Sequence, residues 1–170
     1  MRMRDNNKLA HEKAVADQVL QELKIKPLDF RHGNPDKKEP DTLYRIDTKN
    51  IGIEVVSAYY TEKEAKAAAE AAAEKPLAAD EIREGEIIGS PDELICEAIQ
   101  DCLNEKSEKV YSGTDETWLC IDADAPLTES AIIEECIKNL AVPKHGFARL
   151  FVSLRLSENE GGGVKVIEFK

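Results

Sequence analysis

Apolar residues recur at helical spacing in three stretches of the chain, and each stretch predicts an amphipathic helix. The first helix is predicted over residues 8–24 and ends at Pro27. The second begins at the capping box Ser90-Pro-Asp-Glu93, and the third is capped by Thr128. Residues 61–75 are almost wholly Ala, Glu and Lys, so helix propensity predicts a further, largely exposed helix there.

Residues with high β-propensity cluster in six shorter segments, which predict strands. These segments are residues 28–31, 41–46, 51–56, 117–121, 149–156 and 164–169. Strands mixed with helices in this order favour an α/β fold with a central mixed sheet flanked by helices. A chain of 170 residues is about one domain long, so a single domain over residues 1–170 is expected.

Charge is distributed unevenly along the chain. The formal net charge is -11, which argues against indiscriminate binding of nucleic acid because an acidic surface repels phosphate. Residues 1–49 carry 11 Lys and Arg against 9 Asp and Glu, whereas residues 50–170 carry 12 against 25. A phosphate backbone that docks on this protein is therefore expected to dock near the N-terminal third.

The cysteines bear on the cellular compartment. Cys96, Cys102, Cys120 and Cys136 fall in or beside predicted helices and strands, and no two have zinc-knuckle spacing. We expect reduced, mostly buried thiols, which fit a cytoplasmic protein better than a secreted one. The sequence offers neither an export signal nor the ~18 consecutive apolar residues of a membrane span, so no membrane partner is expected.

Two carboxylates, those of Asp41 and Glu54, are the strongest candidates for chemistry. If the hairpin turns on Thr48 and Lys49, the strand ladder makes the two acids diagonal neighbours on one face, with Cα atoms roughly 7–8 Å apart. Carboxylates at that separation can hold one Mg²⁺ together with water and substrate phosphate. A loop of odd length would instead send the two side chains to opposite faces of the sheet.

A third acid, Glu12, lies on the first predicted helix. At 100° per residue it falls on the axis of the apolar stripe, one turn before Val15 and Ala16, so its side chain is predicted to point inward.

The sequence Pro40-Asp41, a hairpin, and then Glu54 in the apolar strand Ile-Gly-Ile-Glu-Val-Val resembles the signature of the PD-(D/E)XK nuclease superfamily. The element order over most of residues 8–124 is similar to that superfamily's restriction-endonuclease-like αβββαβ core, here with extra C-terminal strands. The resemblance implies a nuclease that depends on Mg²⁺ or Mn²⁺ and hydrolyses phosphodiesters in DNA. It assigns Asp41 and Glu54 as catalytic metal ligands and gives Glu12 an assisting role, through a water molecule or an indirect contact.

One position departs from that signature. Two residues after Glu54 the superfamily carries a lysine that orients the attacking water and offsets negative charge, and this chain has Val56 there. In similar proteins the lysine can come from the following helix, so we expect Lys66, or alternatively Lys63, to take the catalytic role.

Two other functions stay open. Val56 and the acidic composition also fit a catalytically degenerate relative that acts as an interaction or accessory module, with a protein partner or as a homo-oligomer. A continuous acidic stripe would instead fit a mimic of nucleic acid that occupies another protein's basic groove.

Asp122 and Asp124 could bind a metal at a strand end, but Pro126 after them favours a plain loop. The three histidines are too scattered in sequence to suggest a triad.

Overall fold

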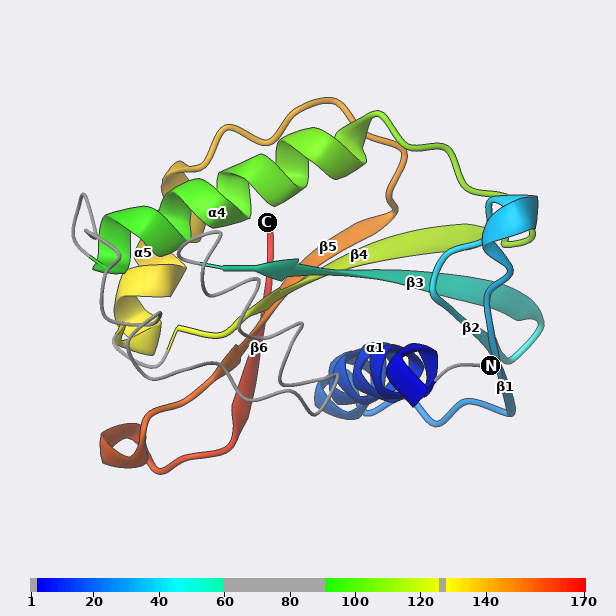
Figure 1. Cartoon of the computed structure of the whole chain (residues 1–170), viewed down its shortest axis with the longest axis horizontal. Helices are drawn as coiled ribbons and strands as arrows, with labels where there is room; N and C mark the ends of the chain where they lie inside the picture. The colour runs from blue at the N-terminus through cyan, green and yellow to red at the C-terminus, as the bar shows by residue number, and fades with distance from the viewer. Residues whose placement is uncertain (1–2, 60–90, 126–127) are drawn as a thin grey trace.

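A computed structural model of the chain describes residues 3–59, 91–125 and 128–170 (Figure 1). In chain order its elements are α1 (Met3–Glu22), β1 (Asp29–His32), the 3-10 turn η1 (Pro35–Lys37), β2 (Thr42–Ile46), β3 (Lys49–Ala58), α4 (Pro91–Ser107), β4 (Glu116–Ala123), α5 (Ser130–Asn139), β5 (Arg149–Arg155), the 3-10 turn η2 (Glu158–Glu160) and β6 (Val164–Glu168). The helix predicted over residues 61–75 lies outside the described residues.

The strands form one mixed sheet with the order β1-β2-β3-β4-β5-β6. The central pairs β3–β4 and β4–β5 are parallel, whereas β1–β2, β2–β3 and β5–β6 are antiparallel. Helix α1 covers one face of the sheet, and α4 and α5 cover the other (Figure 1). The predicted α/β class, with a mixed central sheet between helices, is confirmed, as is the closing strand pair.

Alternation along β3 decides which of its side chains meet which helix. Ile51, Ile53 and Val55 belong to the core beneath α1. Val56 and Ala58 belong to the opposite core, beneath α4 and α5. Because alternate residues of a strand share a face, Glu54 projects to the side of the sheet that α4 covers.

The β2–β3 hairpin differs from the prediction by one residue in each strand. Ile46 pairs with Lys49, so the turn is made by Asp47 and Thr48 rather than by Thr48 and Lys49. Asp47 has a φ of 52°, a left-handed conformation that a short polar Asp side chain tolerates better than most residues do. Since the loop keeps an even length, the predicted sharing of one face by Asp41 and Glu54 is unaffected.

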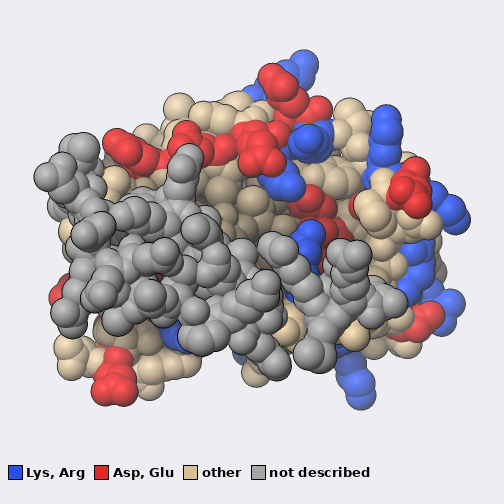
Figure 2. All heavy atoms as spheres, viewed as in Figure 1, with Lys and Arg blue, Asp and Glu red and all other residues tan. Residues whose placement is uncertain are grey.

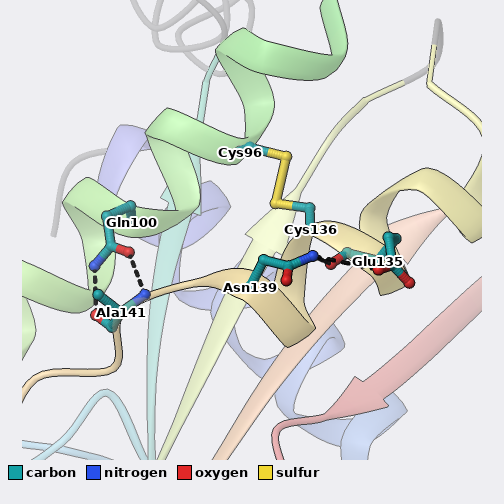
Figure 3. The surroundings of a disulfide bond; sticks show 6 residues. All are labelled: Cys96, Gln100, Glu135, Cys136, Asn139 and Ala141. Carbon is teal, nitrogen blue, oxygen red and sulfur yellow. Dashed lines mark hydrogen bonds between the residues drawn. A yellow bond between two sulfur atoms is a disulfide. The ribbon is translucent and has the colours of Figure 1, made fainter.

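The prediction of four reduced cysteines is wrong for one pair. Cys96 of α4 and Cys136 of α5 form a disulfide, with their Cα atoms 6.0 Å apart (Figure 3). This pairing depends on how two helices dock, which spacing in the sequence does not reveal. Cys102 and Cys120 are buried free thiols, as predicted. The cysteines therefore no longer favour a cytoplasmic location over an oxidising one.

A hydrogen-bonded contact beside the disulfide also joins α4 to the segment after α5. The Gln100 side-chain amide donates to the carbonyl of Ala141 at 2.8 Å, and its oxygen accepts from the Ala141 N–H at 3.0 Å (Figure 3). The two helices are thus fixed to each other at two neighbouring points.

Two further observations complete the fold. Helix α5 has Glu129 as its N-cap, one residue after the predicted cap at Thr128, and the Ser130 N–H donates to Oε1 of Glu160 from η2 at 2.9 Å. A carboxylate from a distant turn therefore supplies the capping interaction.

Among the described residues, no helix combines the length and the apolar character that a membrane span requires.

Candidate active site

The two predicted acids meet where β2 begins, next to the middle of β3. The β2–β3 pairing begins at Thr42 and Ile53, and extending this register by one pair sets Asp41 directly opposite Glu54. The predicted diagonal arrangement is thus replaced by a closer, direct one. The backbone N–H of Asp41 donates to Oε2 of Glu54 at 3.3 Å, and the N–H of Val55 donates to Oδ2 of Asp41 at 2.9 Å. Each carboxylate therefore accepts a hydrogen bond from the opposite strand.

Two glycines allow this approach of Pro40-Asp41 to the sheet. A Cβ atom on Gly52 would lie 2.2 Å from Cγ of Pro40, and one on Gly33 would lie 1.7 Å from the Pro40 carbonyl oxygen. Both distances are shorter than any real contact, so any larger residue at either position would displace Pro40 and the acid that follows it. Gly52, which lies within β3, therefore allows Pro40 to approach the strand and so sets the position of Asp41.

A lysine that the sequence analysis did not identify completes the pair. Lys106, in the last turn of α4, donates from Nζ to Oε1 of Glu54 at 2.9 Å. Both side chains are largely buried, with exposed fractions of 16% for Lys106 and 9% for Glu54. Burial lowers the pKa of Lys106, but its hydrogen bond and its attraction to Glu54 outweigh that effect and leave the pKa above its usual value. The amine therefore stays charged and compensates the buried carboxylate.

Glu12 approaches the same cluster from α1. Only 5% of Glu12 is exposed, which confirms the predicted inward orientation, and its Oε1 lies 3.2 Å from Nζ of Lys8. Burial lowers the pKa of Lys8, but the charges of Glu12, Asp41 and Glu54 together hold it above its usual value. Glu12 also raises the pKa of Asp41, which places it within electrostatic range of the pair. Figure 2 shows Asp and Glu atoms set back between α4 and α1, with Lys and Arg atoms beside them.

The close carboxylates alter the proton affinity of Asp41. Burial is the largest cause, followed by repulsion from Glu54, and with a smaller contribution from Glu12 these raise the pKa of Asp41 to about 7. The hydrogen bond from Val55 opposes this rise without cancelling it. At neutral pH the site therefore holds a carboxyl group that is only partly ionised.

This shift predicts that Asp41→Asn stabilises the metal-free protein at alkaline pH. The pKa of Asp41 is raised from 3.8 in the unfolded chain, so its contribution to stability is complete below about pH 4 and is lost as pH rises through 7. The asparagine keeps an oxygen for the Val55 N–H but carries no charge. We expect a gain on the order of 2 kcal/mol in the free energy of unfolding at pH 8, which becomes smaller as pH falls and approaches zero below about pH 4.

Denaturant unfolding of both proteins with a chelator present measures this difference. Asp47→Asn is the matched control, because Asp47 is exposed in the hairpin turn and tolerates the same change. A loss of stability for Asp41→Asn at pH 8 would contradict the assigned repulsion.

Tyr111 adds a hydroxyl group on the α4 side of the pair. Burial raises the pKa of Tyr111, and the negative charge of Glu54 and a hydrogen bond to it raise that pKa further. The ring of Tyr111 contacts that of Phe147 with 5.7 Å between centroids. The tyrosine therefore stays protonated and serves as a donor beside Glu54.

A second polar pair lies next to Glu12 on α1. Nε2 of His11 is 2.9 Å from Oδ2 of Asp122, and this hydrogen bond raises the pKa of His11. Asp122 lies inside β4 rather than in the loop that the sequence suggested, because the strand continues to Ala123. No contact joins Asp124 to this pair among the described residues.

The predicted residues thus converge in part. Asp41 and Glu54 are in contact through the backbone, and Glu12 is close enough to affect Asp41. Lys66 and Lys63 lie outside the described residues, and Lys106 was missed. Helix α4 follows β3 and precedes β4, so its last turn lies near the sheet. A lysine in that last turn is the sequence signal that could have identified Lys106.

Comparison of the chain with family models, with curated proteins and with solved structures finds no match. Within residues 3–59, 91–125 and 128–170, no group of three or more His, Cys, Asp or Glu side chains is arranged to hold a metal ion. Any metal bound at the acid pair would therefore use two carboxylates and complete its coordination with water and a bound phosphate, as Mg²⁺ commonly does.

Proposed function

We propose that this protein is a metal-dependent nuclease that hydrolyses phosphodiester bonds in DNA with Asp41, Glu54 and Lys106. The observation that carries the proposal is the cluster where β2 begins beside β3: backbone hydrogen bonds hold the Asp41 and Glu54 carboxylates close together, and the largely buried helix residue Lys106 donates to Glu54. Two acids and one amine in one cluster are the groups that the PD-(D/E)XK signature combines. The order α1-β1-β2-β3-α4-β4, with β4 parallel to β3, further supports a restriction-endonuclease-like core with two added strands.

Lys106 supplies the group that Val56 lacks. Val56 lies on the same face of β3 as Glu54 and packs in the apolar core beneath α4. The amine reaches Glu54 from the last turn of that helix instead. A positive charge there can offset the negative charge that develops on a phosphate during attack, and it can hold a water molecule by donating to it.

The acid pair fits a hard divalent cation such as Mg²⁺ or Mn²⁺. Both groups offer carboxylate oxygens, and a bound cation would relieve the repulsion from Glu54 that, together with burial, raises the pKa of Asp41. When bound, the cation would supply Lewis acidity and lower the pKa of a bound water. Asp41 and Glu54 would hold it, Glu12 would orient nearby water, and the hydrogen bond from Lys106 fixes the Glu54 carboxylate beside Asp41.

Metal binding by wild type and Asp41→Ala is the direct test of the pair. Titration calorimetry with Mg²⁺ or Mn²⁺ is expected to give one site for wild type and a loss of affinity of at least about tenfold for Asp41→Ala. Because binding must displace a proton from Asp41, wild-type affinity is expected to rise between pH 6 and pH 8. Equal binding by both proteins would remove the proposed site.

One observation favours a second candidate, a catalytically inactive module of the same architecture. Val56 stands where the signature has lysine, so the signature is incomplete on β3 itself. Incubation of the purified protein with plasmid and with single-stranded DNA separates the two candidates. Cleavage that needs Mg²⁺ or Mn²⁺ and disappears in Glu54→Gln excludes the inactive module, whereas metal binding without cleavage of either DNA supports it.

A further inference from the structure

Two turns meet beside the acid pair. The N–H of Ser112 donates to the carbonyl of Lys38 at 3.0 Å, and its hydroxyl donates to the carbonyl of Lys37. The N–H of Lys109 donates to the carbonyl of Lys106 at 3.0 Å, so Lys109 follows directly on the end of α4. The connection from α4 to β4 is therefore tied to η1 at Ser112, three residues after Lys109.

Lys37, Lys38 and Lys109, which we call the lysine ridge, are all exposed. In the described part of the chain none of the three forms an ion pair, whereas Lys8, Arg31 and Lys106 do. Figure 2 shows several Lys and Arg side chains at the end of the molecule where η1 lies, with Asp and Glu atoms among them. Three positive charges without an ion pair, on turns that contact each other, stand out in a chain of net charge -11, and the charge of Lys37 also acts on the nearby Glu39.

The ridge borders the acid pair from two directions. Lys38 precedes Asp41 by three residues, and Lys109 follows Lys106 by three residues. Three residues span at most about 10 Å, so the backbone of each turn starts within that distance of a group in the site. A polyanion repelled by the remaining surface would be attracted where these charges lie, directly beside the carboxylates.

We propose that the lysine ridge binds the sugar–phosphate backbone of a DNA duplex and sets it across the Asp41–Glu54 pair. The proposal rests on the proposed nuclease function, because it names the surface that holds the substrate of that site. Lysines contact phosphates as point charges and carry no sequence information, so the ridge would position the duplex without selecting a base sequence.

The test compares two variants of equal charge change. Lys37→Gln, Lys38→Gln and Lys109→Gln together remove the ridge. Lys24→Gln, Lys26→Gln and Lys170→Gln together are the control, because these lysines are also exposed, form no ion pair within the described residues and belong to neither turn. Each set includes one lysine in the left-handed conformation, Lys38 or Lys24, which balances backbone effects.

Fluorescence anisotropy with a short duplex, in a chelator and between 50 and 200 mM salt, measures the contribution of phosphate contacts. Loss of three such contacts reduces the salt slope by about 2.7, so wild-type affinity should fall about 40-fold more than that of the ridge variant over this range. The control should keep the wild-type slope. An unchanged slope in the ridge variant, or an equal change in both variants, would overturn the proposal.

The two proposals fail in different experiments. Ridge-dependent DNA binding without cleavage in any metal would remove the nuclease function and leave the ridge. Metal-dependent cleavage with an unchanged salt slope in the ridge variant would remove the ridge and leave the nuclease.

Discussion

Lys106→Met is expected to lower the rate of metal-dependent DNA cleavage by about 10²- to 10³-fold, the usual effect of removing one group that stabilises transition-state charge. The substitution keeps the length and apolar contacts of the side chain while removing its positive charge. Without metal it also leaves Glu54 buried beside Asp41 with no cation, which is expected to cost about 3 kcal/mol of folding free energy.

Cleavage rates at saturating Mg²⁺, with unfolding measured with and without Mg²⁺, separate the two effects. Metal should restore much of the lost stability, because it compensates the same carboxylates, but it should not restore the rate. Lys138→Met is the control, since Lys138 also lies in the last turn of a helix and pairs with a glutamate, at an exposed site. If Lys106→Met cleaved DNA at the wild-type rate, the amine would have no part in catalysis.

Removal of the Cys96–Cys136 disulfide is expected to cause the largest loss of stability. The bond joins positions 40 residues apart. It lowers the chain entropy of the unfolded state, and this stabilises the folded state by about 4 kcal/mol. For a chain of this size, that is a fall in melting temperature of about 8–16 °C. Cys96→Ser with Cys136→Ser is the variant, followed by thermal unfolding.

A reductant supplies the internal control for that experiment. It should lower the melting temperature of wild type towards that of the double variant and leave the double variant unchanged, because Cys102 and Cys120 are free. Equal melting temperatures for the oxidised wild type and the double variant would show that the bond does not stabilise the fold.

The disulfide also bears on the proposed site through α4. Cys96 and Gln100 hold this helix to α5 and the segment after it (Figure 3). Lys106 extends from the last turn of the same helix to Glu54. A helix fixed at one end presents its last turn in one position. The placement of the amine therefore depends on contacts made at Gln100 and Cys96, which lie about 1.7 and 2.8 helical turns before Lys106.

Part of the candidate site could be predicted because it depends on local periodicity. Glu12 points inward because helical spacing puts it on the apolar stripe, and Asp41 and Glu54 share a face because the hairpin loop has an even length. The error of one residue in the turn did not matter to the face, since only the parity of the loop decides it. Local spacing could not show that Asp41 and Glu54 lie directly opposite each other.

The sequence by itself determined the α/β class, the strands of the mixed sheet, the apolar faces of its helices and the two acids on one face, because each follows from the spacing of neighbouring residues. Only the tertiary structure decided that Lys106 reaches Glu54, that Cys96 bonds Cys136, and that His11 meets Asp122. These partners are 40 to 111 positions apart. Their contacts depend on how the helices dock on the sheet. That docking is decided by packing throughout the core, and local sequence patterns do not reveal it.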